Sequence, residues 1–141
     1  MSEEWKQASW VSFLGMIAWI LGIISGIIYV IWGLTAAITL AAVPLGLGLP
    51  FMGIPVWQII SGIIAILISF FIILPKFSRK CQKKDWEGLL NWNFNIGGIK
   101  FPWMLFWGIM LEIFSYGWGG FLVIVLSLVL LFAGPRKYDW K

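Results

Sequence analysis

Pro44-Leu-Gly-Leu-Gly-Leu-Pro50-Phe-Met-Gly53-Ile-Pro55 interrupts a long uncharged segment and divides it in two. No Asp, Glu, Lys or Arg occurs between Lys6 and Lys76. About 20 apolar residues cross the hydrocarbon core of a bilayer, so this segment is too long for one crossing. Proline and glycine at such density end helices. The sequence therefore predicts two membrane spans, over about 10–33 and 55–74.

The composition of the whole chain points to the same environment. Of its 141 residues, 61% are hydrophobic and 11% are charged. A soluble domain carries about a quarter charged residues, and so few charges would leave most of a soluble surface apolar. We expect an integral membrane protein. The first apolar run exceeds the roughly 7–15 residues of a signal-peptide core, so we expect it to be retained as a span.

Two further spans are expected in the C-terminal half, over about 99–116 and 118–133, joined by a glycine-containing turn. The last of these is short for a span, so it needs flanking residues or a locally thinner bilayer. The predicted fold is an all-α integral membrane protein, a single domain over 1–141 with four transmembrane helices arranged as two hairpins. Three arrangements remain open for residues 34–53: an extension of the first helix, an interfacial segment or a re-entrant one.

The linker expected at 75–98 begins with a basic cluster, made of Lys76, Arg79, Lys80, Lys83 and Lys84. Beyond it, one helical face carries Trp86, Leu89, Leu90 and Phe94. This periodicity predicts a short amphipathic helix lying on the membrane surface, with Asp85 as its N-cap. A solvated linker, or a brief strand at 92–96, is the alternative.

The basic residues also predict an orientation. With four spans, both termini and the linker share one side, and all ten Lys and Arg residues fall on that side. Basic residues in short loops mark the cytoplasmic side. We therefore expect a multi-pass protein of the plasma membrane with cytoplasmic termini. The basic cluster is a candidate contact for anionic lipid headgroups, and its place beside apolar runs argues against nucleic acid as a partner.

Small residues recur on one face of the first span, where Gly15, Gly22, Gly26 and Gly33 lie. Small residues at such spacing let helices approach closely. We expect this face to pack against another span of the same chain; an oligomer interface is the alternative.

Glu112 is the acidic residue inside an expected span. An ionisable side chain in a membrane helix is costly, so it usually faces protein or water. One hypothesis is an intramembrane site for a proton or cation. The other is a carboxylate that reaches the interface or bonds with Tyr116, Ser115 or a tryptophan N–H.

The chain has no histidine and one cysteine, Cys81. An intramolecular disulfide and a multi-cysteine metal site are excluded, as are most sets of nucleophile and base. We expect no enzyme activity, cofactor or metal. Cys81 is interpreted as an incidental thiol, with acylation as the alternative. The expected function is a structural or interaction subunit that packs with itself or with a larger membrane complex; the alternative is a small oligomeric transporter or channel that uses Glu112.

The stretch Lys83-Lys84-Asp85-Trp86-Glu87-Gly88, together with the glycine-rich first span and the glycine-hinged second hairpin, resembles small uncharacterised prokaryotic, often archaeal, four-helix membrane proteins. The resemblance implies a four-helix layout. It implies no activity and no site residues.

Overall fold

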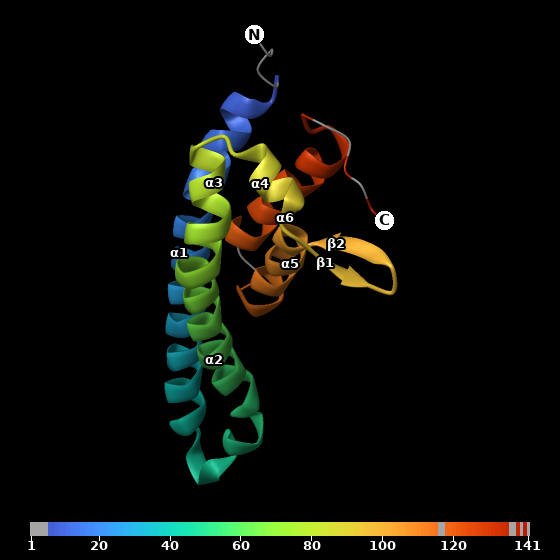
Figure 1. Ribbon diagram of the computed structural model, residues 1–141. Coiled ribbons are helices and arrows are strands. Elements are labelled where there is room, and N and C mark those ends of the chain that lie inside the picture. Colours follow the sequence, from blue (N-terminus) through green and yellow to red (C-terminus); the bar gives the residue numbers. More distant parts are fainter. Residues whose placement is uncertain (1–5, 116–117, 136–137, 139, 141) are drawn as a thin grey trace.

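The computed structural model describes residues 6–115, 118–135, 138 and 140, and it consists of two helical hairpins of unequal length (Figure 1). The first arm of the long hairpin is α1 (Ala8–Ala41). Its second arm is a continuous helix, Leu49–Gln82, made of η2 (Leu49–Phe51), α2 (Gly53–Ile68), the π-helical η3 (Ser69–Ser78) and α3 (Arg79–Gln82). Each arm has 34 residues and is long and apolar enough to cross a membrane.

The turn of the long hairpin lies well beyond the expected end of the first span. Because α1 continues to Ala41, residues 34–41 extend the first helix, which was one of the three open arrangements. The chain then turns through the short helical turn η1 (Pro44–Gly46), where Leu45 and Gly46 have φ of 60° and 67°. Leu45 is 95% exposed, so the tip of the hairpin is apolar.

The prediction that the second helix ends at Leu74 is wrong. The helix continues through Pro75 to Gln82 because the segment around the proline is π-helical rather than α-helical. In an α-helix the proline ring clashes with the carbonyl four residues back. A π-helix has wider turns, with hydrogen bonds from i to i+5, and accommodates the ring.

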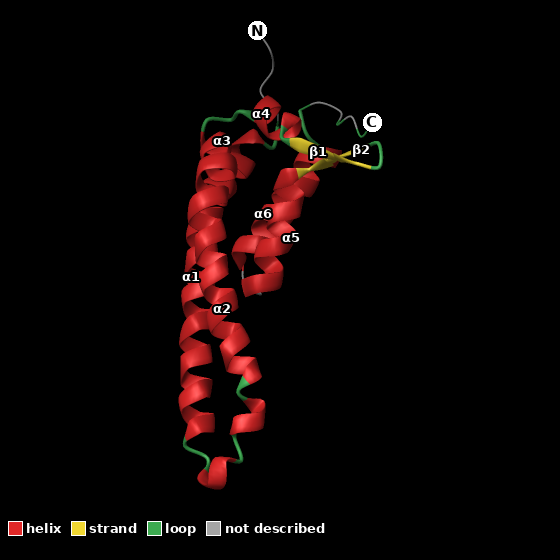
Figure 2. Cartoon of the chain, turned by 60° about the horizontal axis from the view of Figure 1, so that its bottom comes forward, coloured by secondary structure: helices red, strands yellow, loops and turns green. Residues whose placement is uncertain are grey.

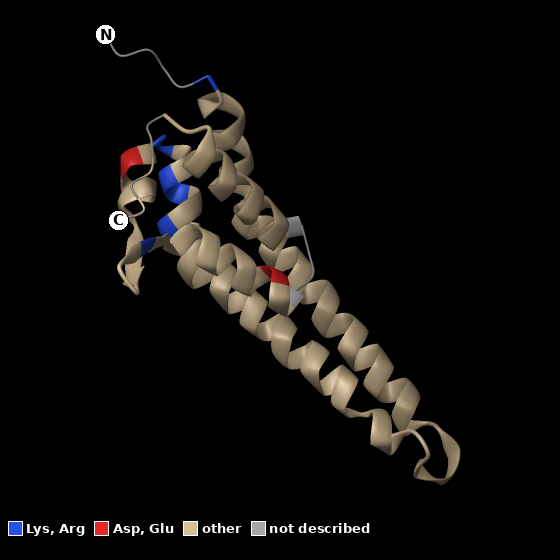
Figure 3. Ribbon diagram, turned by 90° about the vertical axis from the view of Figure 1, so that its right-hand side faces the viewer, with Lys and Arg blue, Asp and Glu red and all other residues tan. Residues whose placement is uncertain are grey.

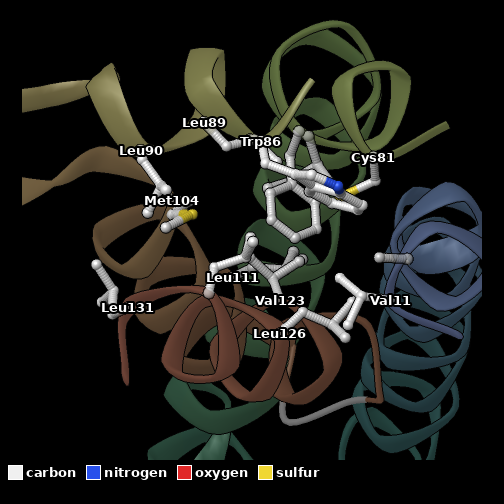
Figure 4. Close-up of a cluster of buried hydrophobic side chains, with 14 of the residues drawn as sticks. Val11, Cys81, Trp86, Leu89, Leu90, Met104, Leu111, Val123, Leu126 and Leu131 are labelled. Atoms are coloured by element: carbon white, nitrogen blue, oxygen red, sulfur yellow. The ribbon is translucent and has the colours of Figure 1, made fainter. Parts of the chain in front are cut away.

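The linker contains both a helix and a β-hairpin. The helix α4 (Trp86–Asn91) begins at Asp85, whose carboxylate accepts a hydrogen bond of 3.1 Å from the Gly88 N–H, which confirms the predicted N-cap. The apolar face of α4 does not lie on a membrane surface as expected: Trp86, Leu89 and Leu90 are buried in the core of the protein. Figure 4 shows these side chains in the same cluster as Met104 and Leu111.

The strand alternative is confirmed for the residues after α4. Strand β1 (Asn93–Ile96), which contains Phe94, pairs antiparallel with β2 (Ile99–Pro102). Gly97 and Gly98 have φ of 56° and 86°, as a tight hairpin turn requires. The expected start of a span at 99 is therefore wrong, because β2 occupies that position.

The second helical hairpin is short. It consists of α5 (Trp103–Ser115), with 13 residues, and α6 (Trp118–Phe132), with 15. At 1.5 Å per residue these helices are about 20 and 22 Å long, against about 30 Å for the hydrocarbon core. Gly119, near the start of α6, packs on the backbone of Gly22 of α1. Since Gly22 precedes the end of α1 by 41 − 22 = 19 residues, the start of α6 lies about 28 Å before that end.

The molecule thus has two parts, which Figure 2 shows one above the other. In the bundle, residues 8–22 of α1 pack with η3, α3, α5 and α6 around most of the buried side chains. In the projecting hairpin, residues 23–68, the two arms pack mainly on each other, and the second arm also packs on α5, where the rings of Trp57 and Phe114 have centroids 5.9 Å apart. The projecting hairpin exposes apolar side chains over its whole length, among them Ile31, Trp32, Ile38, Leu45, Trp57 and Ile60.

Candidate functional site

Glu112 lies near the end of α5 and faces the start of α6. A Cβ added to Gly120 would come within 2.5 Å of the Glu112 backbone nitrogen and 2.9 Å of its Oε2. The two helices therefore touch through their backbones here, because Gly120 has no side chain. Figure 3 shows an acidic segment midway along the molecule, whereas the other coloured charges gather near the end that holds the termini.

The Glu112 carboxylate sits at the amino end of α6. The backbone of Phe121 donates a hydrogen bond to it. The first N–H groups of a helix have no partner within that helix, and that end carries a partial positive charge. The carboxylate thus serves as a cap for the neighbouring helix, a third arrangement besides the two considered from the sequence.

One oxygen of the carboxylate remains available for chemistry. Glu112 Oε2 is buried and has no hydrogen-bond partner among the described residues. Such an oxygen can accept a proton or a hydrogen bond from water. Within the described part of the chain no three His, Cys, Asp or Glu side chains gather as a metal site would need. Tyr116, proposed as a partner of Glu112, lies outside the described residues.

Ser69 is a buried polar residue that the sequence analysis missed. Its side chain packs against Gly22, the residue that Gly119 also contacts. Its Oγ, like that of Ser61, is buried without a hydrogen-bond partner among the described residues. The spacing Ser61, Ala65, Ser69 was the available signal, because small residues four apart share one helical face.

The glycine face of α1 packs against the second arm of the same hairpin. Gly15 lies on Cys81 and Gly22 on Ser69. A Cβ on Gly26 would come within 2.7 Å of the Gly62 carbonyl oxygen, and one on Gly33 would come within 2.9 Å of the Pro55 carbonyl oxygen. The glycine face is therefore occupied within the chain.

The basic cluster lies at the end of the molecule that also holds the chain termini (Figure 3). Lys80 turns back to its own chain: its Nζ donates a hydrogen bond of 3.4 Å to the Gly88 carbonyl and lies 5.7 Å from the centre of the Trp92 ring. The other four members, Lys76, Arg79, Lys83 and Lys84, have exposed side chains.

Cys81 does not present its thiol to solvent or lipid. Its side chain is fully buried, and it packs on Gly15. Figure 4 shows it within the cluster that Trp86 also enters. Acylation requires an accessible thiolate, so this burial favours a packing role.

No protein-family model, no curated protein and no solved structure matches this chain. The candidate site is therefore defined by the geometry of its own residues.

Proposed function

We propose that the chain is a small integral protein of the cell membrane with a structural or interaction role, and that the projecting hairpin is the part that crosses the bilayer. The observation that carries this proposal is the uncharged, apolar surface of that hairpin. Each arm of the long hairpin has 34 residues, about 51 Å at the helical rise, so a hydrocarbon core of about 30 Å can contain most of the projecting hairpin together with the end of the short hairpin.

The charges support an orientation for this hairpin. No basic residue lies on the projecting hairpin. The basic cluster lies at the end of the second arm and just after it, Lys6 lies just before α1, and Lys100 lies in β2. By the positive-inside rule the bundle end is cytoplasmic, together with both termini. Arg136, Lys137 and Lys141, which contributed to the predicted orientation, lie outside the described residues.

The short hairpin enters the membrane from the cytoplasmic side in this proposal. A four-span layout would require the bilayer to thin to about 20–22 Å around α5 and α6. An arrangement in which α5 and α6 turn within the bilayer needs no such thinning. Backbone at membrane depth must be covered by protein, and Gly119 and Gly120, at the start of α6, are buried against Gly22 and Glu112. The start of α6, with Glu112, then lies inside the membrane.

The interaction role follows from what the projecting hairpin leaves uncovered. Apart from the contacts of its second arm with α5, the projecting hairpin is covered only where its two arms face each other, and apolar side chains such as Ile38, 71% exposed, face outward. A second copy of the chain or a larger membrane protein can pack there. Because the glycine face is already occupied, such packing would use the larger side chains.

A photoactivatable residue at Ile38 tests this role in native membranes. Phe132, 73% exposed at the far end of the bundle, is the matched control position. We expect a protein adduct of defined mass from position 38 and lipid adducts or weak labelling from position 132. Lipid adducts alone at both positions would contradict the interaction role.

A second candidate function, transport of a proton or small cation, is favoured by Glu112 Oε2, which is buried and has no hydrogen-bond partner among the described residues. The test is flux into liposomes that contain purified protein, comparing wild type with Glu112→Gln. Measurable flux that the substitution abolishes would establish this function. Equal flux, or none in the wild type, removes it.

A further inference from the structure

An apolar groove of about 470 Å³ runs along the outside of the bundle, between the second arm of the long hairpin and α5. Leu67, Phe71 and Ile72 line one side, and Trp107, Met110 and Phe114 line the other. Its volume lies in the range of small-molecule sites. Among the described residues, no charged side chain lines it and no polar atom is exposed in it, so a polar or charged ligand finds no hydrogen-bond partner inside the groove.

The groove runs along the helix axes, as a lipid chain does. Its lining on the second arm extends over two helical turns, from Ile64 to Ile72. The lining on α5 runs the opposite way along the chain, from Trp107 to Phe114, so the ends at Ile72 and Trp107 share the bundle end of the groove. This end points toward the basic cluster.

Lys76 lies at that end. In a π-helix a turn takes between four and five residues, so the position one turn beyond Phe71 and Ile72 is Lys76. Helical side chains lean toward the amino end of their helix, which directs Lys76 back toward the groove. Lys76 is exposed. A positively charged side chain thus lies next to the bundle end of the apolar groove.

Trp103 marks the same end on α5. It lies one turn before Trp107, and the two rings stack with centroids 6.1 Å apart and an interplanar angle of 18°. Tryptophan prefers the headgroup level, where its ring is in an apolar environment and its N–H meets polar groups. Lysine and tryptophan together therefore place the lipid headgroup region at this end.

We propose that the groove holds one acyl chain of an anionic phospholipid, and that the phosphate of this lipid lies at Lys76. The apolar lining favours a hydrocarbon chain over a polar metabolite, and the lysine favours negative charge. Glu112, the carboxylate of α5, packs toward Gly120 of α6 rather than into the groove. No acidic side chain of the described residues lines the groove, so none of them opposes the phosphate there.

This proposal rests on the membrane location proposed above. The experiment uses full-length protein in nanodiscs with equal amounts of phosphatidylglycerol and phosphatidylcholine, followed by native mass spectrometry of the lipids that remain bound after release. We expect one phosphatidylglycerol to remain in preference to phosphatidylcholine. Lys76→Gln should reduce that preference about fivefold, whereas Lys83→Gln, the matched control in the same cluster, should not.

A second pair of variants tests the groove itself. Leu67→Trp fills it from an exposed position, and Ile63→Trp adds the same ring to an exposed position one turn earlier that does not line it. We expect Leu67→Trp to lose retention of both lipids and Ile63→Trp to retain them. If Lys76→Gln equals Lys83→Gln, or if Leu67→Trp equals Ile63→Trp, the proposal is overturned while the membrane location stands. Failure of wild-type protein to enter nanodiscs overturns both.

Discussion

Gly26 of α1 and Gly62 of α2 lie back to back, and each approaches the backbone of the other. A Cβ on Gly26 would come within 2.7 Å of the Gly62 carbonyl oxygen, and a Cβ on Gly62 within 2.6 Å of the Gly26 carbonyl oxygen. Real contacts of this kind do not occur below about 3 Å. The two arms of the long hairpin therefore hold their separation only because both positions lack a side chain.

Gly26→Ala should destabilise the protein by about 1–3 kcal/mol, because the new methyl group forces the two arms apart. The measurement is unfolding in mixed micelles with increasing dodecyl sulfate. Gly53→Ala is the matched control, since a Cβ there meets nothing within 4 Å. Equal stability of the two variants would show that the arms do not pack at this distance.

The double variant Gly26→Ala, Gly62→Ala should cost less than the sum of the two single changes. Once one methyl group has separated the arms, the second meets more space, so the two sites are coupled. The same titration measures this coupling. Additive losses would mean that each glycine is needed for its own backbone conformation rather than for the shared contact.

The contact between Gly26 and Gly62 illustrates the kind of structural feature that the sequence alone can predict. The small residues of α1 indicate a helix contact because a missing side chain has the same consequence in any fold. Asp85 is equally readable, since a cap bonds to an N–H three residues away. Both features depend on local spacing alone.

Pro75 and Gly119 show what sequence spacing leaves open. A proline favours the end of an α-helix, and only the packing of the second arm on α1 shows that a π-helix continues instead. The depth of the short hairpin depends on the contact between Gly119 and Gly22, which are far apart in the chain. Neither outcome follows from periodicity, and both affect where Glu112 lies.

The contact between Gly119 and Gly22 leads to a prediction about depth. Because Gly120 packs on Glu112, the end of α5 lies at the height of Gly22. Spin labels at Ile113 and Ile24, 49% and 46% exposed, should therefore have the same depth in a bilayer. Collision rates with oxygen and a polar nickel complex measure that depth, in a background with Cys81→Ala.

A label at Ile38 provides the reference for this experiment. It lies 38 − 24 = 14 residues further along α1, or about 21 Å. If the label at Ile113 matches Ile38 instead of Ile24, the short hairpin crosses the bilayer and the four-span layout is correct.

Cys81 should resist modification in the folded protein. Its side chain has no exposed surface and packs on Gly15, and a buried thiol is inert. In mild detergent, a maleimide reagent should therefore react with Cys81 of the folded protein at least about tenfold more slowly than with Cys81 of the unfolded protein. Lys83→Cys, exposed two residues away, is the positive control. Equal labelling of the two thiols in the folded state would place Cys81 at the surface.

Asp85→Ala should loosen α4 without unfolding the bundle. Losing an N-cap costs about 0.5–2 kcal/mol, and here the Gly88 N–H loses its acceptor. Hydrogen exchange should therefore speed up at the amides of Leu89 and Leu90 and stay unchanged in α1. Asp85→Asn keeps an acceptor oxygen and should restore most of the protection.

The stabilities of Glu112→Gln and Glu112→Leu, compared with each other, distinguish a capping role of Glu112 from a transport role. If the carboxylate stabilises α6 by accepting from the Phe121 N–H, Glu112→Gln keeps an acceptor and should cost less than Glu112→Leu. Leucine leaves that N–H without its acceptor, at about 1–3 kcal/mol. Dodecyl sulfate unfolding measures this order.

The opposite order has an equally definite meaning. A carboxylate kept for ion or proton binding carries the cost of an ionisable group inside the membrane, and an apolar leucine would relieve that cost. Glu112→Leu more stable than both wild type and Glu112→Gln would therefore show that stability is not what retains the carboxylate. Oε2, which accepts no hydrogen bond from the described residues, would then be the functional atom, and the flux comparison between wild type and Glu112→Gln would test whether it takes part in transport.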